Sequence, residues 1–511
     1  MEIASNLLLG LSVALTPENL LYCLFGVFVG TLIGVLPGIG ALAAISMLFP
    51  LTFHLEPTTA LIMLAGIYYG TAYGGSTASI LLNIPGTTSS AVTCLDGYPM
   101  AQQGRAGVAL AMTAFASFFG GVFGILVLSA FTPLVAAWAL SFGSAEYFAL
   151  MVLGLVAAST VSDGSPVKGL AMVVLGMLLA TIGMDPQSGV ARYTFGSLSL
   201  LDGLSISALA MGLFGVAEII TSVRANTGRT IQARDVSLRS LMPTRDDFRR
   251  SWMPALRAST IGSLFGALPG TGPTVASFVS YGVEKRIAKD PSRFGKGAVE
   301  GVVAPEAANN AADQTAFIPT LSLGVPGSAT MALMIGAMMV HGIHPGPNLV
   351  TEEPELFWGL VMSFWIGNLM LVILNLPLIG LWVRLLTVPY KILYPAILML
   401  VCIGAYSVHY KAFDVMVVLG FGALGYLMRI FSMPAAPLLL GFVLGPLIEQ
   451  HFRRAMVLAR GDFSAVIERP ISGTVLLITL LVLVWSLWSS FRKRRQTLAA
   501  ATPGSRIEDE D

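Results

Sequence analysis

The sequence has few charged residues. Only 11% of its 511 residues are Asp, Glu, Lys or Arg, whereas 55% are hydrophobic and the mean hydropathy is +0.78. Soluble domains carry about 25% charged residues. The deficit argues against a soluble multidomain protein and predicts one polytopic unit in a lipid bilayer. A net charge of +1, with no basic stripe, also argues against a nucleic-acid partner.

Residues that carry common catalytic chemistry are equally scarce. The three cysteines (Cys23, Cys94 and Cys402) lie in or beside apolar segments, which indicates core residues and no disulfide framework. The five histidines lack ligand spacing, and no phosphate-binding loop or nucleophile motif occurs. We therefore expect neither an enzyme nor a cofactor. No Lys or Arg precedes Arg105, so the first apolar segment is predicted to be retained rather than cleaved as a signal peptide.

A glycine-proline motif occurs twice. Residues 30–40 are GTLIGVLPGIG and residues 262–272 are GSLFGALPGTG, each inside a long apolar run. A Pro-Gly pair interrupts a helix, and lipid cannot satisfy the freed backbone groups, so such a break must be packed in protein or line a cavity. Paired breaks in two halves indicate the binding site of a transporter. The predicted substrate or ion-binding residues are Pro37, Gly38, Gly40, Pro269, Gly270, Thr271 and Gly272.

A second pair of breaks follows the first. LNIPGT (82–87) aligns with LGVPGS (323–328), and the neutral, hydroxyl-rich segment 72–94 predicts a re-entrant hairpin or an unwound helix. Hydroxyl and amide groups bind carboxylate oxygens or complete a cation shell. Hydrogen bonds between helices are the alternative role for any single Ser or Thr here. The predicted site residues are Ser76, Thr77, Asn83, Pro85, Gly86, Thr87, Thr88, Pro326, Gly327 and Ser328.

The segment NNAADQT (309–315) places an acid at membrane depth. Asp313 is predicted to bind Na⁺ or a proton together with Asn309, Asn310 and Gln314, because an ionisable group there is costly unless paired or hydrated. The alternative is a cap for the following helix. Glu306 is expected at the membrane interface. Since the glycine-rich motifs contain no Lys or Arg, co-bound cations would offset an anionic substrate, and the neutral oxygens favour Na⁺ over H⁺.

These features predict an all-α polytopic membrane protein with two homologous halves, each with Pro-Gly-broken helices and a re-entrant hairpin, and about 10–14 membrane segments in all. The predicted divisions are a first repeat (1–223), an arginine-rich cytoplasmic linker (224–257), a second repeat (258–491) and a cytoplasmic tail (492–511). Inverted repeats fit the charge distribution best, and parallel repeats are the alternative. The arginines of 451–469 conflict with this topology unless 434–449 is re-entrant or the helix count is off by one.

Long stretches of the chain resemble the large membrane subunit of the tripartite tricarboxylate transporters. They are residues 30–53, 68–104, 268–286, 301–347 and 444–463. The resemblance implies a multi-pass protein of the bacterial inner membrane that imports tricarboxylates or related carboxylates by cation-coupled symport. It also implies two partners, a small membrane subunit and a periplasmic substrate-binding protein.

Of two other functions, the sequence is compatible with one and lacks the residues that the second would need. A stand-alone carboxylate permease or channel would have similar broken helices and would need no periplasmic partner. An intramembrane enzyme would need a catalytic dyad or a metal pair at membrane depth, which the sequence does not contain.

Overall fold

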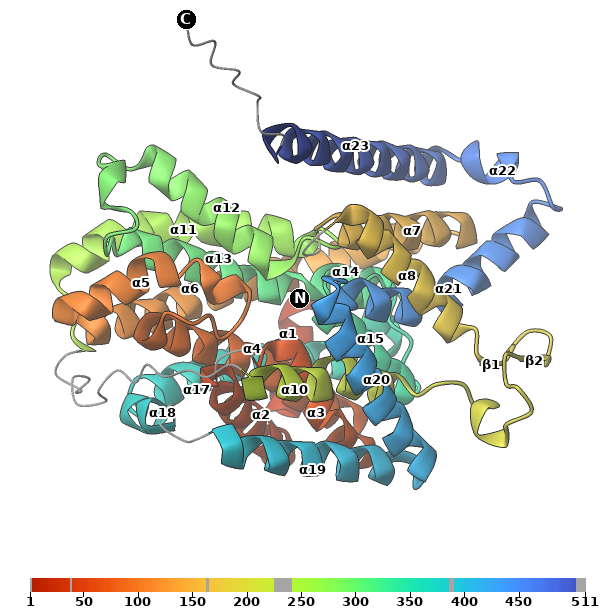
Figure 1. Ribbon diagram of the computed structural model, residues 1–511, viewed down its shortest axis with the longest axis horizontal. Coiled ribbons are helices and arrows are strands. Elements are labelled where there is room, and N and C mark those ends of the chain that lie inside the picture. The colour runs from red at the N-terminus through yellow and green to blue at the C-terminus, as the bar shows by residue number, and fades with distance from the viewer. Residues whose placement is uncertain (1, 37–38, 162–164, 225–240, 386–389, 502–511) are drawn as a thin grey trace, which may run out of the picture.

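A computed structural model describes residues 2–36, 39–161, 165–224, 241–385 and 390–501. The chain is 80% helical, and its only sheet among these residues is a two-stranded hairpin. Long apolar runs with little charge leave the backbone to satisfy its own hydrogen bonds, which a helix does within one segment. The predicted all-α polytopic fold is confirmed (Figure 1).

The part of the chain up to residue 224 forms ten helices and one β-hairpin in the described ranges. A π-helical segment, Met211–Val216, joins the last two helices. The elements are α1 (Glu2–Ala14), α2 (Pro17–Val35), α3 (Ala41–Leu48), α4 (Pro57–Leu82), α5 (Cys94–Met100), α6 (Ala106–Ala139), α7 (Ser144–Val161), α8 (Pro166–Ala180), β1 (Gly183–Met184), β2 (Ala191–Arg192), α9 (Ile206–Ala210) and α10 (Ala217–Arg224).

The part after residue 240 contains helices joined by loops and no strand in its described ranges. Its elements are α11 (Arg245–Ala267), α12 (Gly272–Ile287), α13 (Glu300–Thr315), α14 (Phe317–Leu323), α15 (Ala329–Val340), α16 (Leu349–Glu352), α17 (Pro354–Asn375), α18 (Ile379–Leu385), α19 (Tyr390–His409), α20 (Ala412–Ile430), α21 (Ala435–Leu458), α22 (Ser464–Ile467) and α23 (Pro470–Ala501).

Six helical segments in the described ranges are long and apolar enough to cross a membrane. They are Pro17–Val35, Cys94–Ala139, Pro354–Asn375, Ala412–Ile430, Ala435–Leu458 and Pro470–Ser490. Several shorter apolar helices, including α7 and α8, lie among them. Broken and short helices are therefore as characteristic of this chain as full-length spans.

Helix α2 packs on α4 through two rows of glycines spaced four residues apart. A Cβ atom at Gly30 would lie 2.4 Å from the carbonyl oxygen of Ile67, and one at Gly70 would lie 2.6 Å from the carbonyl oxygen of Val27. The two backbones therefore approach so closely that no larger side chain fits at these positions. This contact fixes the first half of the predicted motif, Gly30 and Gly34, against the middle of α4.

Helix α13 is surrounded on several sides. It packs on α11, where a Cβ atom at Gly262 would lie 2.2 Å from the carbonyl oxygen of Ala308. It also packs on α6, where a Cβ atom at Gly120 would lie 2.2 Å from the carbonyl oxygen of Ala307. Every described residue from Gly301 to Thr315 is buried. This burial is unusual because α13 carries two acids and three amide side chains along that stretch.

The segment 72–94 is less unwound than predicted. Helix α4 stays regular through Leu82, because the hydroxyl of Ser79 donates to the carbonyl oxygen of Gly75 (3.0 Å) and Gly74 packs against the backbone of α2. Only residues 83–88 leave the helix before a short 3₁₀ turn and α5. The break is therefore short and is not an extended unwound helix.

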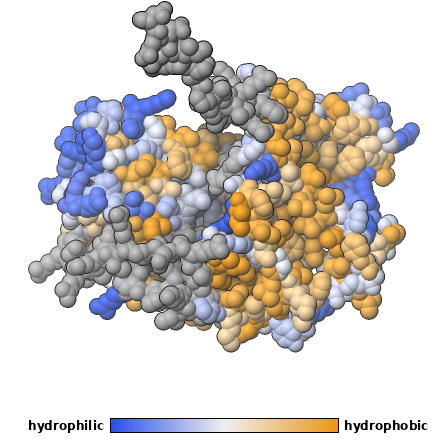
Figure 2. Space-filling view, viewed as in Figure 1, coloured by the Kyte–Doolittle hydropathy of each residue, from blue (hydrophilic) through white to orange (hydrophobic). Residues whose placement is uncertain are grey.

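Polar residues gather at the two ends of the long axis. Figure 2 shows hydrophilic side chains at the left, over α5, α11 and α12, and a broad hydrophobic surface across the middle. Helix α11 begins at Arg245, inside the segment predicted as a linker, and residues 225–240 of that segment lie outside the described residues. The β-hairpin and α22 lie at the opposite, right-hand end (Figure 1).

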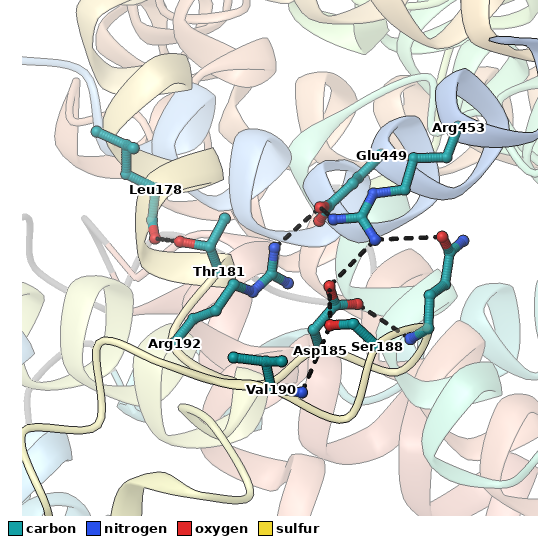
Figure 3. A network of polar contacts seen from close by, with 9 residues as sticks. Leu178, Thr181, Asp185, Ser188, Val190, Arg192, Glu449 and Arg453 are labelled. Atoms are coloured by element: carbon teal, nitrogen blue, oxygen red, sulfur yellow. Dashed lines mark hydrogen bonds and ion pairs between the residues drawn. The ribbon is translucent and has the colours of Figure 1, made fainter.

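Two of the four arginines of 451–469, Arg453 and Arg469, are paired with acids at this second end. Arg453 contacts Asp185 (3.1 Å) and Glu449 (2.5 Å), Arg192 contacts Glu449 (2.9 Å), and Arg469 contacts Glu146 (2.9 Å). Figure 3 shows the first three of these pairs, between the loop after α8 and α21. Because nearby acids neutralise these arginines, they need not mark a cytoplasmic face.

Asp185 belongs to the loop between α8 and α9. The backbone N–H of Gln187 and the hydroxyl of Ser188 donate to its carboxylate, and Arg453 lies beside it. These donors hold the pKa of Asp185 well below its usual range, in that order of importance. The charged form is therefore part of the folded structure.

Candidate functional site

The two LPG motifs begin with the same backbone geometry. Leu36 after α2 has φ −77° and ψ 115°, and Leu268 after α11 has φ −88° and ψ 121°. Each of these leucines donates its N–H to the carbonyl oxygen three residues earlier. An extended leucine thus ends both helices before a new helix starts, as the paired motifs predict.

The second pair of breaks also matches. Asn83 after α4 and Gly324 after α14 occupy equivalent places in LNIPGT and LGVPGS, and both adopt the left-handed conformation, with φ 55° and 66°. In the second copy the N–H of Gly270 donates to the carbonyl oxygen of Gly327 (3.0 Å), which joins the two breaks directly. Across the copies, the hydroxyls of Thr88 and Thr274 lie 2.9 Å apart.

A cavity of about 820 Å³ lies where these breaks meet, and we call it the central cavity. Ligand pockets are typically about 300–1,000 Å³. Its wall includes the first residues of four helices, α3, α12, α15 and α21. The lining residues of these four helix starts are Gly40, Ala41, Leu42, Thr271, Gly272, Pro273, Thr274, Val275, Ser328, Ala329, Thr330, Pro434, Ala435, Ala436 and Pro437.

Helix starts give the cavity a positive potential. The first N–H groups of a helix have no partner within it, and the aligned peptide dipoles place about half a positive charge at that end. Ser328 uses its hydroxyl to cap one of these groups, the N–H of Met331 (3.3 Å). Four such ends around one cavity favour a bound anion.

The cavity wall also holds one acid and one base. Asp313 accepts a hydrogen bond from the hydroxyl of Tyr68 (2.5 Å), and both side chains are buried. Arg429, near the end of α20, is paired with Glu218 of α10 and keeps 42% of its side chain exposed. The carboxyl of Asp313 contacts a tyrosine of helix α4, so it is not a cap for α14.

The structure brings nine of the predicted residues to the central cavity. These are Gly40, Thr87, Thr88, Gly270, Thr271, Gly272, Asp313, Gly327 and Ser328. Both copies of both motifs are represented among them. The predicted binding role of each residue stays a prediction.

Pro37 and Gly38 lie outside the described residues. The other predicted residues do not line this cavity. Asn83 and Pro85 lie off its wall, and Gly86 packs against α4, where its Cβ would lie 2.4 Å from the Cα of Gly75. The remaining residues off the wall are Ser76, Thr77, Pro269, Asn309, Asn310, Gln314 and Pro326. Most of them are packed among the helices around the site.

Several lining residues were not predicted from the sequence. Tyr68 and Thr71 lie in an apolar part of α4, where no motif marks them. Arg429 and Ser432 lie just before Pro434, and an arginine inside an apolar span is a signal that could have identified this wall. Glu306, expected at the membrane interface, is 0% exposed because α4, α6 and α11 pack around it.

Comparisons with known proteins agree with this architecture. Residues 20–440 match the model of the tripartite tricarboxylate transporter TctA family. A 52.8 kDa protein of Agrobacterium vitis, described by its place in the TAR-I ttuC' 3' region, is 50% identical over 495 residues, or 97% of this chain and 98% of that protein. No solved structure matches.

A second relative from Agrobacterium vitis, described by its place in the TAR-II ttuC' 3' region, is 53% identical over 234 residues, 46% of this chain and 97% of that protein. The family model spans the central cavity and all four breaks around it. The chain therefore belongs to the tripartite tricarboxylate transporter TctA family.

Proposed function

We propose that this chain is the membrane-spanning subunit of a binding-protein-dependent secondary transporter that imports tricarboxylates or related carboxylates together with a cation. One observation carries the proposal: four helix starts, drawn from both halves of the chain, line one cavity that also holds Asp313 and Arg429. The carboxylate binds in the central cavity.

The electrostatics support an anionic substrate. Each helix start contributes about half a positive charge, and Arg429 adds a full one. Arg429 forms an ion pair with Glu218, and a substrate carboxylate can replace Glu218 as its partner. Hydroxyls of Thr87, Thr88 and Ser328 on the wall supply neutral hydrogen-bonding partners.

A coupled cation binds near Asp313. This carboxylate and the hydroxyls on the wall are oxygen ligands of the kind that Na⁺ prefers, and freed carbonyls at the breaks add further oxygens. A proton on Asp313 is the alternative coupling ion. In either case, the cation offsets part of the two or three negative charges that a di- or tricarboxylate carries into the membrane.

The matched geometry of the breaks supports two structurally related halves. Extended Leu36 and Leu268, and left-handed Asn83 and Gly324, occur at equivalent motif positions. We propose that the halves are inverted repeats in the bacterial inner membrane. A small membrane subunit and a periplasmic substrate-binding protein complete the transporter, as the family name implies for a tripartite system.

Reconstitution tests this function directly. The chain and its small membrane subunit are placed in proteoliposomes, and uptake of citrate and other carboxylates is measured with and without the binding protein. Imposed Na⁺ and pH gradients are applied separately. Uptake that needs both the binding protein and a gradient supports the proposal, and uptake driven by neither gradient rejects cation coupling.

A stand-alone permease or channel is the competing function. The central cavity is compatible with a permease or channel. The close packing of α2 on α4 does not specifically favour that function. Equal uptake rates with and without the binding protein would favour the permease. The same experiment therefore separates the two functions.

A further inference from the structure

Helix α13 carries one continuous polar face. Asn309 and Asn310 lie three and four residues after Glu306, and Asp313 lies four and three residues after them, so these side chains project from one side of the helix. Asp313 lies seven positions after Glu306, which corresponds to about 10 Å along the helix axis. Asp313 reaches the central cavity at one end of this face, and Glu306 lies deeper in the protein.

Glu306 is a fully buried acid without an ion pair in the described part of the chain. Its Oε1 accepts a hydrogen bond from the hydroxyl of Thr93 (2.5 Å), and its Oε2 lies 3.5 Å from the hydroxyl of Ser117 on α6. In contrast, Glu284 is also buried but is contacted by Arg257 at 2.7 Å. A buried carboxylate with only neutral hydroxyls is strongly disfavoured unless it binds a proton or a cation.

The polar face also contains an unsatisfied amide. Asn309 is 1% exposed, and neither its Oδ1 nor its Nδ2 has a hydrogen-bond partner among the described residues, although it lies one helical turn from Glu306. Native proteins rarely leave a buried amide in this state, so it implies a transient partner. A water or a carboxyl group on the same face of α13 would satisfy it.

A second, small cavity lies beyond Glu306. It has a volume of about 10 Å³, and Tyr73, Ser76, Thr113 and Ser117 are among its lining residues. That volume suits about one water molecule. Ser117 lines this cavity and also contacts Glu306, so polar groups continue on both sides of the acid.

We propose that Glu306 is a buried proton-binding site that exchanges its proton with the central cavity along the polar face of α13. This inference rests on the proposed transport function and adds a second ion-binding group to it. A proton fits better than Na⁺ because the carboxyl oxygens contact hydroxyls directly and the adjoining cavity holds only about one water, too little for a full cation shell.

The neighbours of Glu306 leave few competing groups. Among the described residues, the titratable side chains that interact with its charge are Tyr73 on α4, Cys94 on α5 and Asp313 on α13 itself. Helix α6 contains no titratable residue. On α11 and α12, Arg257 and Glu284 pair with each other.

One further tyrosine, Tyr281 of α12, donates to Asp96 (3.0 Å) and is thereby engaged elsewhere. Tyrosine and cysteine are ordinarily neutral near neutral pH. Asp313 is therefore the group whose charge changes with that of Glu306. The two acids exchange a proton through water that the unsatisfied amide of Asn309 binds and orients.

Infrared difference spectroscopy tests the site without requiring transport. The full chain, with its small membrane subunit, is subjected to a pH change in lipid, and bands of protonated carboxyl groups are recorded. Glu306→Gln should remove one of these bands. The control Glu449→Gln, which changes an acid paired with Arg192 and Arg453, should leave that band in place. An unchanged protonated-carboxyl spectrum in Glu306→Gln overturns the proposal.

Transport supplies a second readout. In proteoliposomes with an entrapped pH dye and citrate as the probe, wild type should move protons with citrate, and Glu306→Gln should lose this movement. In wild type the KM for citrate should change with pH. In Glu306→Gln that change should be about 5–150-fold smaller, which is the usual range of coupling between two ligands. Proton movement and a pH dependence that both equal those of wild type overturn the proposal.

The two proposals fail separately. If wild type takes up no carboxylate, the transport function is wrong, whereas the infrared spectrum still decides whether Glu306 binds a proton. If Glu306→Gln does not assemble, Thr93→Val keeps the carboxyl and removes the hydroxyl at 2.5 Å. The proposal then predicts a shifted carboxyl band, and an unshifted band overturns it.

Discussion

The central cavity and the ion-pair network between α21 and the loop after α8 use charge in opposite ways. In the network, Arg453 contacts both Asp185 and Glu449, and Arg192 contacts Glu449 (Figure 3). On the cavity wall, Asp313 contacts a tyrosine and Arg429 contacts Glu218, with about 820 Å³ of open space beside them. Charges in the network satisfy one another through several contacts, whereas on the cavity wall Asp313 contacts a neutral hydroxyl and Arg429, although paired with Glu218, still borders open space.

This difference separates structural from functional charge. A charge that is matched by an opposite charge and by backbone donors stabilises one conformation and has no capacity left for a ligand. A charge on the wall of an open cavity retains that capacity, at a cost in stability. Substitutions in the cavity should therefore impair transport at normal stability, and those in the network should do the reverse.

The largest effect on transport is expected at the second LPG motif. Gly270 has φ +83°, and a Cβ there would lie 2.7 Å from the backbone nitrogen of Ala158. Gly270→Val should therefore abolish uptake, because the left-handed conformation costs about 1–2 kcal/mol for other residues and overpacking about 1–3 kcal/mol. Uptake into proteoliposomes, with assembly checked by size-exclusion chromatography, measures the effect.

The matched control for this change is Gly420→Val on α20. No atom lies within 4 Å of a Cβ at Gly420, and its φ is not positive, so uptake should be retained. If Gly270→Val assembles normally and transports like wild type, the site does not depend on the geometry of this break. Loss of uptake in both variants would point to a general defect of valine in these helices.

The next largest effect is expected at Asp313. Asp313→Asn keeps the size of the side chain and removes its charge, so uptake should lose most of its dependence on an imposed Na⁺ or pH gradient. Asp202→Asn, at an exposed residue paired with Lys411 (2.8 Å), is the control and should keep the wild-type dependence. Should Asp313→Asn keep the gradient dependence of wild type, Asp313 is only structural.

Arg429 should have a moderate effect on substrate affinity. A hydrogen bond to a charged group contributes about 1.5–3 kcal/mol, and about 1.4 kcal/mol corresponds to a tenfold change in affinity. Arg429→Gln should therefore raise the KM for citrate by about tenfold or more and change the maximal rate less. Lys411→Gln, off the cavity wall, should leave the KM unchanged. An unaltered KM in Arg429→Gln would show that helix starts and cations alone hold the carboxylate.

The sequence predicted the parts of the cavity that motifs mark. Both LPG motifs and both second breaks were identified because Pro and Gly interrupt helices for local reasons that a single sequence reveals. Tyr68 could not be found in this way, since its contact with Asp313 joins residues 245 positions apart. Arg429 carried a usable signal, a charge inside an apolar span, that a search for paired motifs does not detect.

The burial of Glu306 could not be predicted for a different physical reason. The segment 300–315 contains three acids and few large apolar side chains, which favours an interfacial position when the segment is considered alone. In the structure, alanines such as Ala307 and Ala308 meet glycines of α6 and α11, and this close packing buries the polar face as well. Burial of a polar helix depends on its neighbours, and the sequence of one segment does not contain that information.

The smallest effect on transport is expected in the network. Asp185→Asn removes a carboxylate that Arg453, Ser188 and the N–H of Gln187 stabilise, so the unfolding midpoint at neutral pH should fall while uptake stays normal. The folded pKa of Asp185 lies below its unfolded value of about 3.9, so its stabilisation is fully present above that pH. It is lost as the pH falls through the folded pKa, and the gap between wild type and variant should therefore narrow under acid. A gap that stays constant with pH, or a loss of uptake at normal stability, would show that this charge serves the transport site and not only the fold.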